Sequence, residues 1–143
     1  MYKKQKFEFI GLVEKVNKDT SQLKIYPTYH KELKSITDFS DIIRLYWLHE
    51  RDAKEHRKTC FVTPKRQLNA SKLGVFASRS PDRSNSISLS VVKLHEVEDC
   101  LLRVQKIDAY EGTSIIDIKP YISQVDCISG VKVLKWTRHG INT

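Results

Sequence analysis

A polar loop at residues 78–88 holds the side chains of this sequence that are best suited to bind a charged ligand. It contains Arg79 and Arg83 among serines, an asparagine, an aspartate and a proline. Strand-forming residues flank it at 74–77 and 87–92, whereas the loop itself is rich in turn formers. A guanidinium donates hydrogen bonds in a planar fork, so two arginines four residues apart indicate a site for a carboxylate or a phosphate. The alternative is a solvated basic loop without a ligand.

A second group suited to chemistry lies in the segment IIDIKPY at residues 115–121. Asp117 and Lys119 are two residues apart in an expected strand, so their side chains should point to the same face. Such a pair is either an exposed ion pair of little energetic value or a group that orients a polar ligand and assists proton transfer. Inside a barrel, it would instead shape the neighbouring loop.

The motifs of other enzyme classes are absent from the sequence. It has no GxGxxG, Walker or HExxH pattern, and the loop serines lack a nucleophile-elbow context. The histidines are not spaced as metal ligands, and Cys60, Cys100 and Cys127 have no CxxC spacing. We therefore expect reduced thiols and no metal site. A lone histidine at a strand end, such as His49, is more often structural than functional.

The composition indicates a single domain over residues 1–143 with a polyanionic partner. Of the 143 residues, 40% are hydrophobic and 29% are charged, which is ordinary for a domain with one core. We find neither a long apolar run nor a signal peptide, so we expect a cytoplasmic protein that does not span a membrane. The net charge of +8 favours RNA or DNA as the partner.

The alternation of apolar and polar residues predicts strands rather than helices. Residues 33–38 are expected to form a brief helical turn, and Glu111-Gly112 is a turn signal between the last two strands. We expect an all-β fold, a small antiparallel β-barrel (or a sandwich) of about eight strands with short helical turns. The expected strands lie at residues 7–16, 22–26, 41–49, 59–63, 73–77, 87–94, 100–107 and 113–118.

Two long segments in this order resemble the motifs of one known family. The segments are GVFASRSP with RSNSISLSVV at residues 74–92, and EGTSIIDIKPY at residues 111–121. They are similar to the TrmO (YaeB-like) tRNA methyltransferases, and FSDIIRLYWLHER at residues 39–51 is a weaker match. The resemblance covers about residues 9–126. It implies a small antiparallel β-barrel, a homodimer, S-adenosyl-L-methionine as the cofactor, and N6-methylation of threonylcarbamoyladenosine beside the anticodon of tRNA.

The resemblance also implies which residues bind the cofactor. The family's arginine falls on Arg79, which suits the carboxylate of the methionine moiety. Its leucine, whose backbone would make the contact, falls on Leu89, and its Asp-Gly-Thr-Pro turn offers amides to the adenine or ribose. Carried over position by position, the implied cofactor-binding residues are His49, Glu50, Arg79, Leu89, Glu111, Gly112, Thr113 and Ser114.

The expected reaction needs a late proton acceptor as well as alignment of donor and acceptor. Asp117 and Tyr121 are the candidates for this acceptor or its relay, and Lys119 is a candidate to tune the site or to pair with a phosphate. Neither the residues nor the resemblance singles out one base. The expected substrate and RNA contacts are Arg83, Asn85, Lys65 and Arg66.

The sequence departs from the family at positions that affect function. Residues 84–88 read SNSIS where the family has Pro-Asn-Pro-Ile-Gly, and Glu50 replaces a glutamine. The family's loop after the first strand is also absent. These departures keep two alternatives open: a non-catalytic barrel that binds S-adenosylmethionine or RNA, and a methyltransferase that acts on a different small substrate.

Two expectations concern the partners. The apolar residues 41–48 and the segment VKVLKW at 131–136 are candidate interface strands of a homodimer. Basic residues at 51–58 and 65–72 are expected to form one rim beside the cofactor pocket, where they would contact tRNA phosphates.

Overall fold

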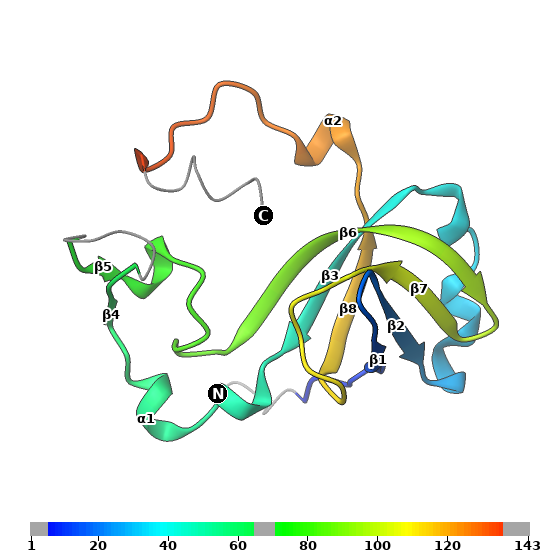
Figure 1. The fold of residues 1–143 in the computed structure, drawn as a ribbon, viewed down its shortest axis with the longest axis horizontal. Coiled ribbons are helices and arrows are strands. Elements are labelled where there is room, and N and C mark those ends of the chain that lie inside the picture. The colour runs from blue at the N-terminus through cyan, green and yellow to red at the C-terminus, as the bar shows by residue number, and fades with distance from the viewer. Residues whose placement is uncertain (1–5, 65–70, 136–143) are drawn as a thin grey trace, which may run out of the picture.

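The main element of the computed structural model, which describes residues 6–64 and 71–135, is a closed antiparallel barrel (Figure 1). Its strand order is β1-β2-β7-β6-β3-β8, and β1 pairs with β8 to close the ring. The strands are β1 (Gly11–Val16), β2 (Thr20–Ile25), β3 (Asp41–Trp47), β6 (Ile87–Glu98), β7 (Leu101–Gln105) and β8 (Ser114–Pro120).

The all-β barrel prediction is confirmed in class, but the barrel has six strands rather than about eight. The other two, β4 (Phe61–Val62) and β5 (Leu73–Gly74), pair only with each other. The predicted strand at 73–77 ends at Gly74, because Val75–Ala77 turns as the 3-10 helix η4. The loop is therefore not flanked by two buried strands, as its apolar neighbours had suggested.

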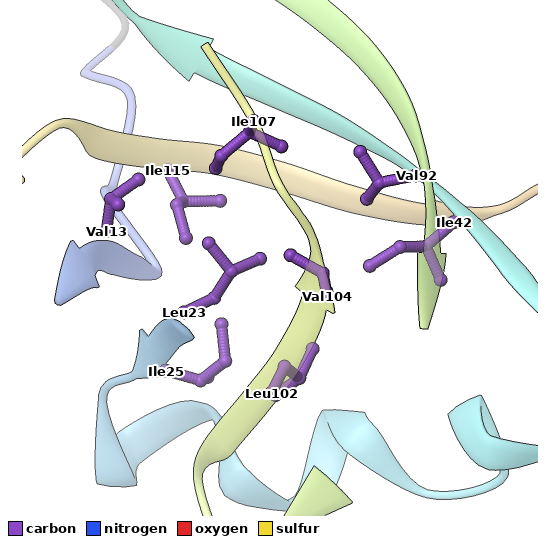
Figure 2. Close-up of a cluster of buried hydrophobic side chains, with 9 residues drawn as sticks. All are labelled: Val13, Leu23, Ile25, Ile42, Val92, Leu102, Val104, Ile107 and Ile115. Carbon is purple, nitrogen blue, oxygen red and sulfur yellow. The ribbon is translucent and has the colours of Figure 1, made fainter. Parts of the chain in front are cut away.

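Aliphatic side chains from all six barrel strands fill the interior (Figure 2). Alternation along each strand puts every second residue inside, as the pleat requires. One buried polar group is satisfied within the core: the Ser21 hydroxyl accepts a hydrogen bond from the Ile107 amide at 3.1 Å. Gly11 permits a close strand approach, since a Cβ there would lie 2.1 Å from the carbonyl oxygen of Lys24.

Short helical segments connect the strands. The helical turn predicted at 33–38 is instead two 3-10 helices, η1 (Pro27–Leu33) and η2 (Ile36–Asp38). Pro27 at the first position explains the earlier start, because its fixed φ suits a helix N-terminus. The remaining segments are η3 (His49–Arg51), α1 (Lys54–Arg57) and α2 (Ser123–Asp126). None of the helices that the structure describes is long and apolar enough to cross a membrane.

One charged side chain lies inside the barrel. Arg44 alternates inward on β3 between Ile42 and Tyr46 and is fully buried. Its guanidinium lies 3.7 Å from the centre of the Tyr46 ring, but none of its nitrogens has a hydrogen-bond partner among the described residues. The Ser90 hydroxyl, opposite Arg44 on β6, is likewise buried without a partner there. Burial lowers the pKa of Arg44 to about 10, so it stays protonated at neutral pH.

Two segments project from the barrel on the same side, next to β6 (Figure 1). One runs from η3 through β4 and β5 to the start of β6, and the other follows α2. Both expose apolar side chains, and so does the outer face of β6. These exposed residues include Phe61, Phe76, Ile87, Leu89, Val91, Val125, Ile128, Val131 and Val133.

Candidate functional site

An open pocket of about 370 Å³ lies where the polar loop returns to β6. Its size is within the range of small-molecule sites. Polar groups of the loop form one part of the wall, and apolar side chains at the start of β6 form the other. The lining residues are Ser78, Arg79, Arg83, Asn85, Ile87, Ser88 and Leu89, so the structure brings together four of the predicted binding residues.

The two arginines of the pocket differ in their contacts. Arg83 is half-buried and donates to the carbonyl oxygens of Ser78 at 3.0 Å and Ser80 at 3.2 Å. Arg79 is exposed and has no hydrogen bond or ion pair with any residue that the structure describes. Arg83 therefore holds the loop together, whereas Arg79 is available for an anionic ligand.

Serine hydroxyls stabilise the loop from within. The buried Ser86 hydroxyl donates to the carbonyl of Pro81 at 2.8 Å. The Asp82 amide donates to the Ser80 hydroxyl at 3.2 Å. Short polar side chains often hold a turn in this way. These bonds provide order in a segment that lacks the family's two prolines.

A second set of contacts ties the loop to the segment after β3. Arg51 donates to both carboxylate oxygens of Asp82, at 3.0 and 2.8 Å, and His56 Nδ1 lies 3.3 Å from the same carboxylate. Arg57 also contacts the loop, because its Nη1 donates to the carbonyl of Ser84. These two arginines were predicted to contact RNA, but both are engaged within the chain. Lys54 and Lys58 are exposed and have no such partner in the described part of the chain, so they stay predicted RNA contacts.

His49 and Glu50 lie on η3, close to the pocket but not in its wall. Both side chains are exposed. The Leu48 amide donates to the carbonyl of Ser86 at 2.9 Å, which joins this turn to the loop. The His49 ring lies at 5.6 Å from the ring of Trp47. The role of His49 and Glu50 in cofactor binding stays a prediction.

Trp47 is a feature of the site that sequence reasoning did not single out. Its indole is stacked on Phe9, with ring centres 5.4 Å apart and planes 6° from parallel. In the ladder between β3 and β6 it lies opposite Ile87, a lining residue. The outward alternation of Trp47 in an apolar strand was the signal that could have identified it.

The turn at 111–114 supports the barrel. Gly112 adopts a positive φ of 85°, which a glycine tolerates best. Glu111 accepts a hydrogen bond from the Val16 amide at 3.1 Å, and buried Thr113 donates to the carbonyl of Tyr110 at 2.7 Å. Ser114 lies opposite Trp47 in the ladder. None of the four lines the pocket, and their predicted contact with the cofactor stays a prediction.

Asp117 and Lys119 share a face of β8, as predicted, and form an ion pair of 2.8 Å. The hydrogen bond that Lys119 donates to Asp117 raises the pKa of Lys119. The pair is exposed on the outer face rather than enclosed in the barrel. In the cross-strand ladders, Leu45 separates Asp117 from Leu89 of the pocket. Two strand spacings therefore lie between them, or about 10 Å.

Tyr121 lies away from the pocket in the same chain. It follows β8, and its amide donates to the carbonyl of Asp41 at 3.0 Å, at the start of β3. Trp47 ends that strand, about 20 Å away at the rise of an extended chain. Burial raises the pKa of the Tyr121 phenol, with smaller contributions from Cys127. A catalytic role for Tyr121 is not supported by proximity within one chain.

Some predicted residues lie outside the part that the structure describes. These are Lys65, Arg66 and Trp136. Within residues 6–64 and 71–135, no group of three or more His, Cys, Asp or Glu side chains is arranged to hold a metal ion.

The fold and the pocket together define a class: a small closed antiparallel barrel with an arginine-containing loop that lines a pocket beside one strand. Such a barrel differs from the parallel α/β sheets that commonly bind nucleotides. The family model for the tRNA-methyltransferase O N-terminal domain matches residues 7–127. The chain therefore belongs to this family, and the resemblance in the sequence is confirmed.

Individual relatives cover different shares of this chain. A probable S-adenosyl-L-methionine-binding protein of Methanocaldococcus jannaschii is 39% identical over 118 residues, which is 82% of this chain and 93% of the relative. The tRNA (adenine(37)-N6)-methyltransferase of Mus musculus is 34% identical over 109 residues, 76% of this chain but 25% of that protein. The chain thus spans only a quarter of this mammalian relative.

Solved structures agree with the fold. A crystal structure of TrmO from Pseudomonas aeruginosa superposes with a TM-score of 0.70 over 91% of this chain and 61% of that chain. The sequences are 23% identical, so this likeness supports the barrel fold alone.

Proposed function

We propose that this protein is an S-adenosylmethionine-dependent methyltransferase that modifies N6 of threonylcarbamoyladenosine beside the anticodon of tRNA. The observation that carries the proposal is the pocket with Arg79, an exposed arginine without a partner among the described residues, in a chain of this family. Relatives named as S-adenosylmethionine-binding proteins and as tRNA (adenine(37)-N6)-methyltransferases support the cofactor and the substrate class.

The residues of the pocket fit the cofactor by their chemistry. Arg79 supplies a charge-assisted donor for the carboxylate of the methionine moiety. Ile87 and Leu89 provide apolar surface for the adenine face or the methionine chain. Ser78 and Asn85 add hydroxyl and amide groups for ribose or purine edges. When bound, the cofactor supplies an electrophilic methyl group on a sulfonium.

The protein's contribution to such a transfer is alignment and acceptance of one proton. The amine nitrogen gains the methyl group, the carbon–sulfur bond breaks, and a proton leaves the nitrogen. Asp117 and Tyr121 stay the candidates for the proton acceptor or its relay, with Lys119 holding the carboxylate by its ion pair. Because both lie away from the pocket of their own chain, this role needs them at the pocket of a second copy. Arg83 would act mainly by keeping the loop in shape.

A homodimer completes this proposal. The outer face of β6 exposes Ile87, Leu89 and Val91 by 40–47%, immediately beside the open side of the pocket. The projecting segment after α2 exposes Ile128 and Val131 by more than half. Exposed apolar side chains of this kind are typical of an interface, and two-fold pairs are the commonest oligomers. A second copy would bring its own residues to the pocket, where those of a single chain leave it open.

The net charge of +8 supports an RNA substrate. Lys54 and Lys58 lie exposed on and after α1, the segment whose arginines contact the pocket loop. Lys65 and Arg66 follow in the chain and remain predicted contacts. We propose that these basic groups bind tRNA phosphates and that the target base enters the pocket beside Asn85.

A non-catalytic S-adenosylmethionine-binding or RNA-binding barrel is the second candidate. The observation that favours it is the separation of Asp117 and Tyr121 from the pocket within one chain. A methyltransferase that acts on another small substrate is a variant of the first candidate with the same cofactor.

Methyl transfer to tRNA from a strain that lacks this N6-methyl group tests the proposal directly. We expect label from the cofactor in threonylcarbamoyladenosine after nuclease digestion and mass spectrometry. Calorimetry should show that Arg79→Met weakens binding of S-adenosylmethionine by about 10- to 100-fold, the scale of a charge-assisted hydrogen bond. Lys31→Met, an equal change of charge on η1, is the control and should bind as the wild type does.

The outcomes separate the candidates. Cofactor binding without transfer to tRNA or to free nucleosides would favour the non-catalytic barrel. Transfer only to a small acceptor would replace the tRNA substrate. Absence of cofactor binding by the wild-type protein would overturn the proposal.

A further inference from the structure

We propose that Asp52 and Arg57 are positioning residues that hold the 82–88 wall of the pocket in its binding shape, a role that rests on the proposed function. Neither residue lines the pocket. Both act through contacts that connect the end of β3 to the pocket loop.

The Asp52 carboxylate is the centre of this connection. Its side chain is only 7% exposed. One oxygen accepts a hydrogen bond from the Trp47 indole nitrogen at 2.8 Å, and Arg57 binds both oxygens through Nε and Nη2. A bidentate arginine–carboxylate pair adds geometric specificity to its charge. Asp52 therefore fixes the indole beside the pocket and the direction of the Arg57 side chain together.

Arg57 extends the connection to the pocket wall. Its Nη1 donates to the carbonyl of Ser84 at 2.9 Å and lies 3.4 Å from the side-chain oxygen of Asn85. Asn85 lines the pocket, and Ser84 directly precedes it. One guanidinium thus joins a nearly buried carboxylate on one side to the pocket loop on the other.

The loop needs such a contact because its backbone is not rigid by itself. Residues 84–88, SNSIS, contain no proline, so φ is not fixed at any of these positions. Ser84 and Asn85 are exposed and are not part of a strand. Arg57 contacts the loop at these two residues, where strand pairing does not yet order it. The Arg51–Asp82 pair holds the preceding turn of the loop in the same manner.

Charge keeps the pair intact at neutral pH. The hydrogen bond from Arg57 lowers the pKa of Asp52, and the Trp47 indole lowers it further against the opposing effect of burial. In return, Asp52 raises the pKa of Arg57. The side chains of Asp52 and Arg57 are therefore both ionised at neutral pH.

Two variants and a matched control test the role. Arg57→Met removes the contact with Ser84, and Asp52→Asn leaves Arg57 without its counter-charge. We expect each to weaken S-adenosylmethionine binding by about tenfold in calorimetry, because one charge-assisted contact is lost. Lys31→Met makes the same change of charge as Arg57→Met, far from the pocket, and should leave the affinity unchanged. Arg57→Lys keeps the charge but not the fork, so it should rescue only part of the affinity.

Hydrogen exchange provides a readout that does not depend on the cofactor. In both variants we expect amides in 82–88 to exchange faster, while amides of β1, β2 and β7 keep their protection. Unchanged exchange in 82–88 would overturn the proposal. Faster exchange with wild-type affinity would also overturn it, since the contact would then stabilise the loop without shaping the pocket. If the wild-type protein binds no cofactor, the proposed function fails, and the exchange data still decide whether the pair holds the loop.

Discussion

Replacing Arg44 by methionine should make this protein more stable, although the change removes a buried residue with a cation–π contact. Arg44 is fully buried in the barrel, and its three guanidinium nitrogens have no hydrogen-bond partner among the described residues. A buried charge is costly unless it is paired and hydrogen-bonded. Methionine has a similar unbranched length and fills irregular core space without a charge.

The size of the effect follows from the pKa of Arg44. Burial lowers it from 12.5 to about 10, and this includes the opposing influence of Tyr46. A fall of that size corresponds to roughly 3 kcal/mol of destabilisation of the charged form, which is the form present at neutral pH. This figure already includes the favourable influence of Tyr46, so the loss of that contact does not lower the gain a second time. We therefore expect Arg44→Met to raise the free energy of unfolding by about 1–3 kcal/mol, the range in which such replacements fall.

Urea denaturation at pH 7 measures this difference. With a slope of about 2 kcal/mol per molar urea, the midpoint should rise by roughly 0.5–1.5 M. Arg44→Lys retains a charge in the same place and should bring no gain. Arg103→Met is a surface control, because Arg103 pairs with Glu96 at 3.3 Å in an exposed position. It should change stability by less than about 0.5 kcal/mol.

A loss of 1 kcal/mol or more in Arg44→Met, with Arg103→Met unchanged, would refute the reasoning. The guanidinium would then have a partner that compensates its burial. Equal stability of Arg44→Met and Arg44→Lys would show that charge is not the cost at this site.

Protonation, association and RNA binding are open to similarly direct tests. The pKa of Asp52 lies below its ordinary 3.8 in the folded protein. Its ion pair therefore stabilises the fold fully above about pH 4, and this stabilisation is lost as the pH falls through the lower folded pKa. In pH-dependent unfolding, Asp52→Asn should flatten the acid-side slope of the free energy of unfolding. Light scattering should give twice 16.6 kDa at micromolar concentration, and Val91→Glu on the exposed face of β6 should halve the mass; a wild-type mass of 16.6 kDa contradicts the dimer. The affinity for tRNA should fall with salt at a log–log slope of roughly −0.7 to −0.9 per phosphate contact, and Lys58→Glu should make it shallower; a flat dependence argues against RNA.

Local patterns were sufficient for the fold class and for several residues that line one pocket. The apolar run at residues 41–49 predicted a strand that the structure shows as β3, ending at Trp47, and the turn signal at Glu111-Gly112 marked the entry to β8. The loop around Arg79 was predicted from its chemistry as a binding site, and the structure places four of the predicted residues in the wall of one pocket. The pairing of Asp117 with Lys119 also follows from their two-residue spacing. Each of these features depends on residues close in sequence, and the pleat and turn geometry relate such residues directly.

Tertiary structure decided what depends on residues far apart in sequence. β4 and β5 pair with each other and not with the barrel strands, and the two residue patterns do not show which strands pair. The burial of Arg44 could not be read from a strand that otherwise appears apolar. The link from Trp47 through Asp52 and Arg57 to Ser84 joins segments that only the closed barrel brings together, because no local period relates them.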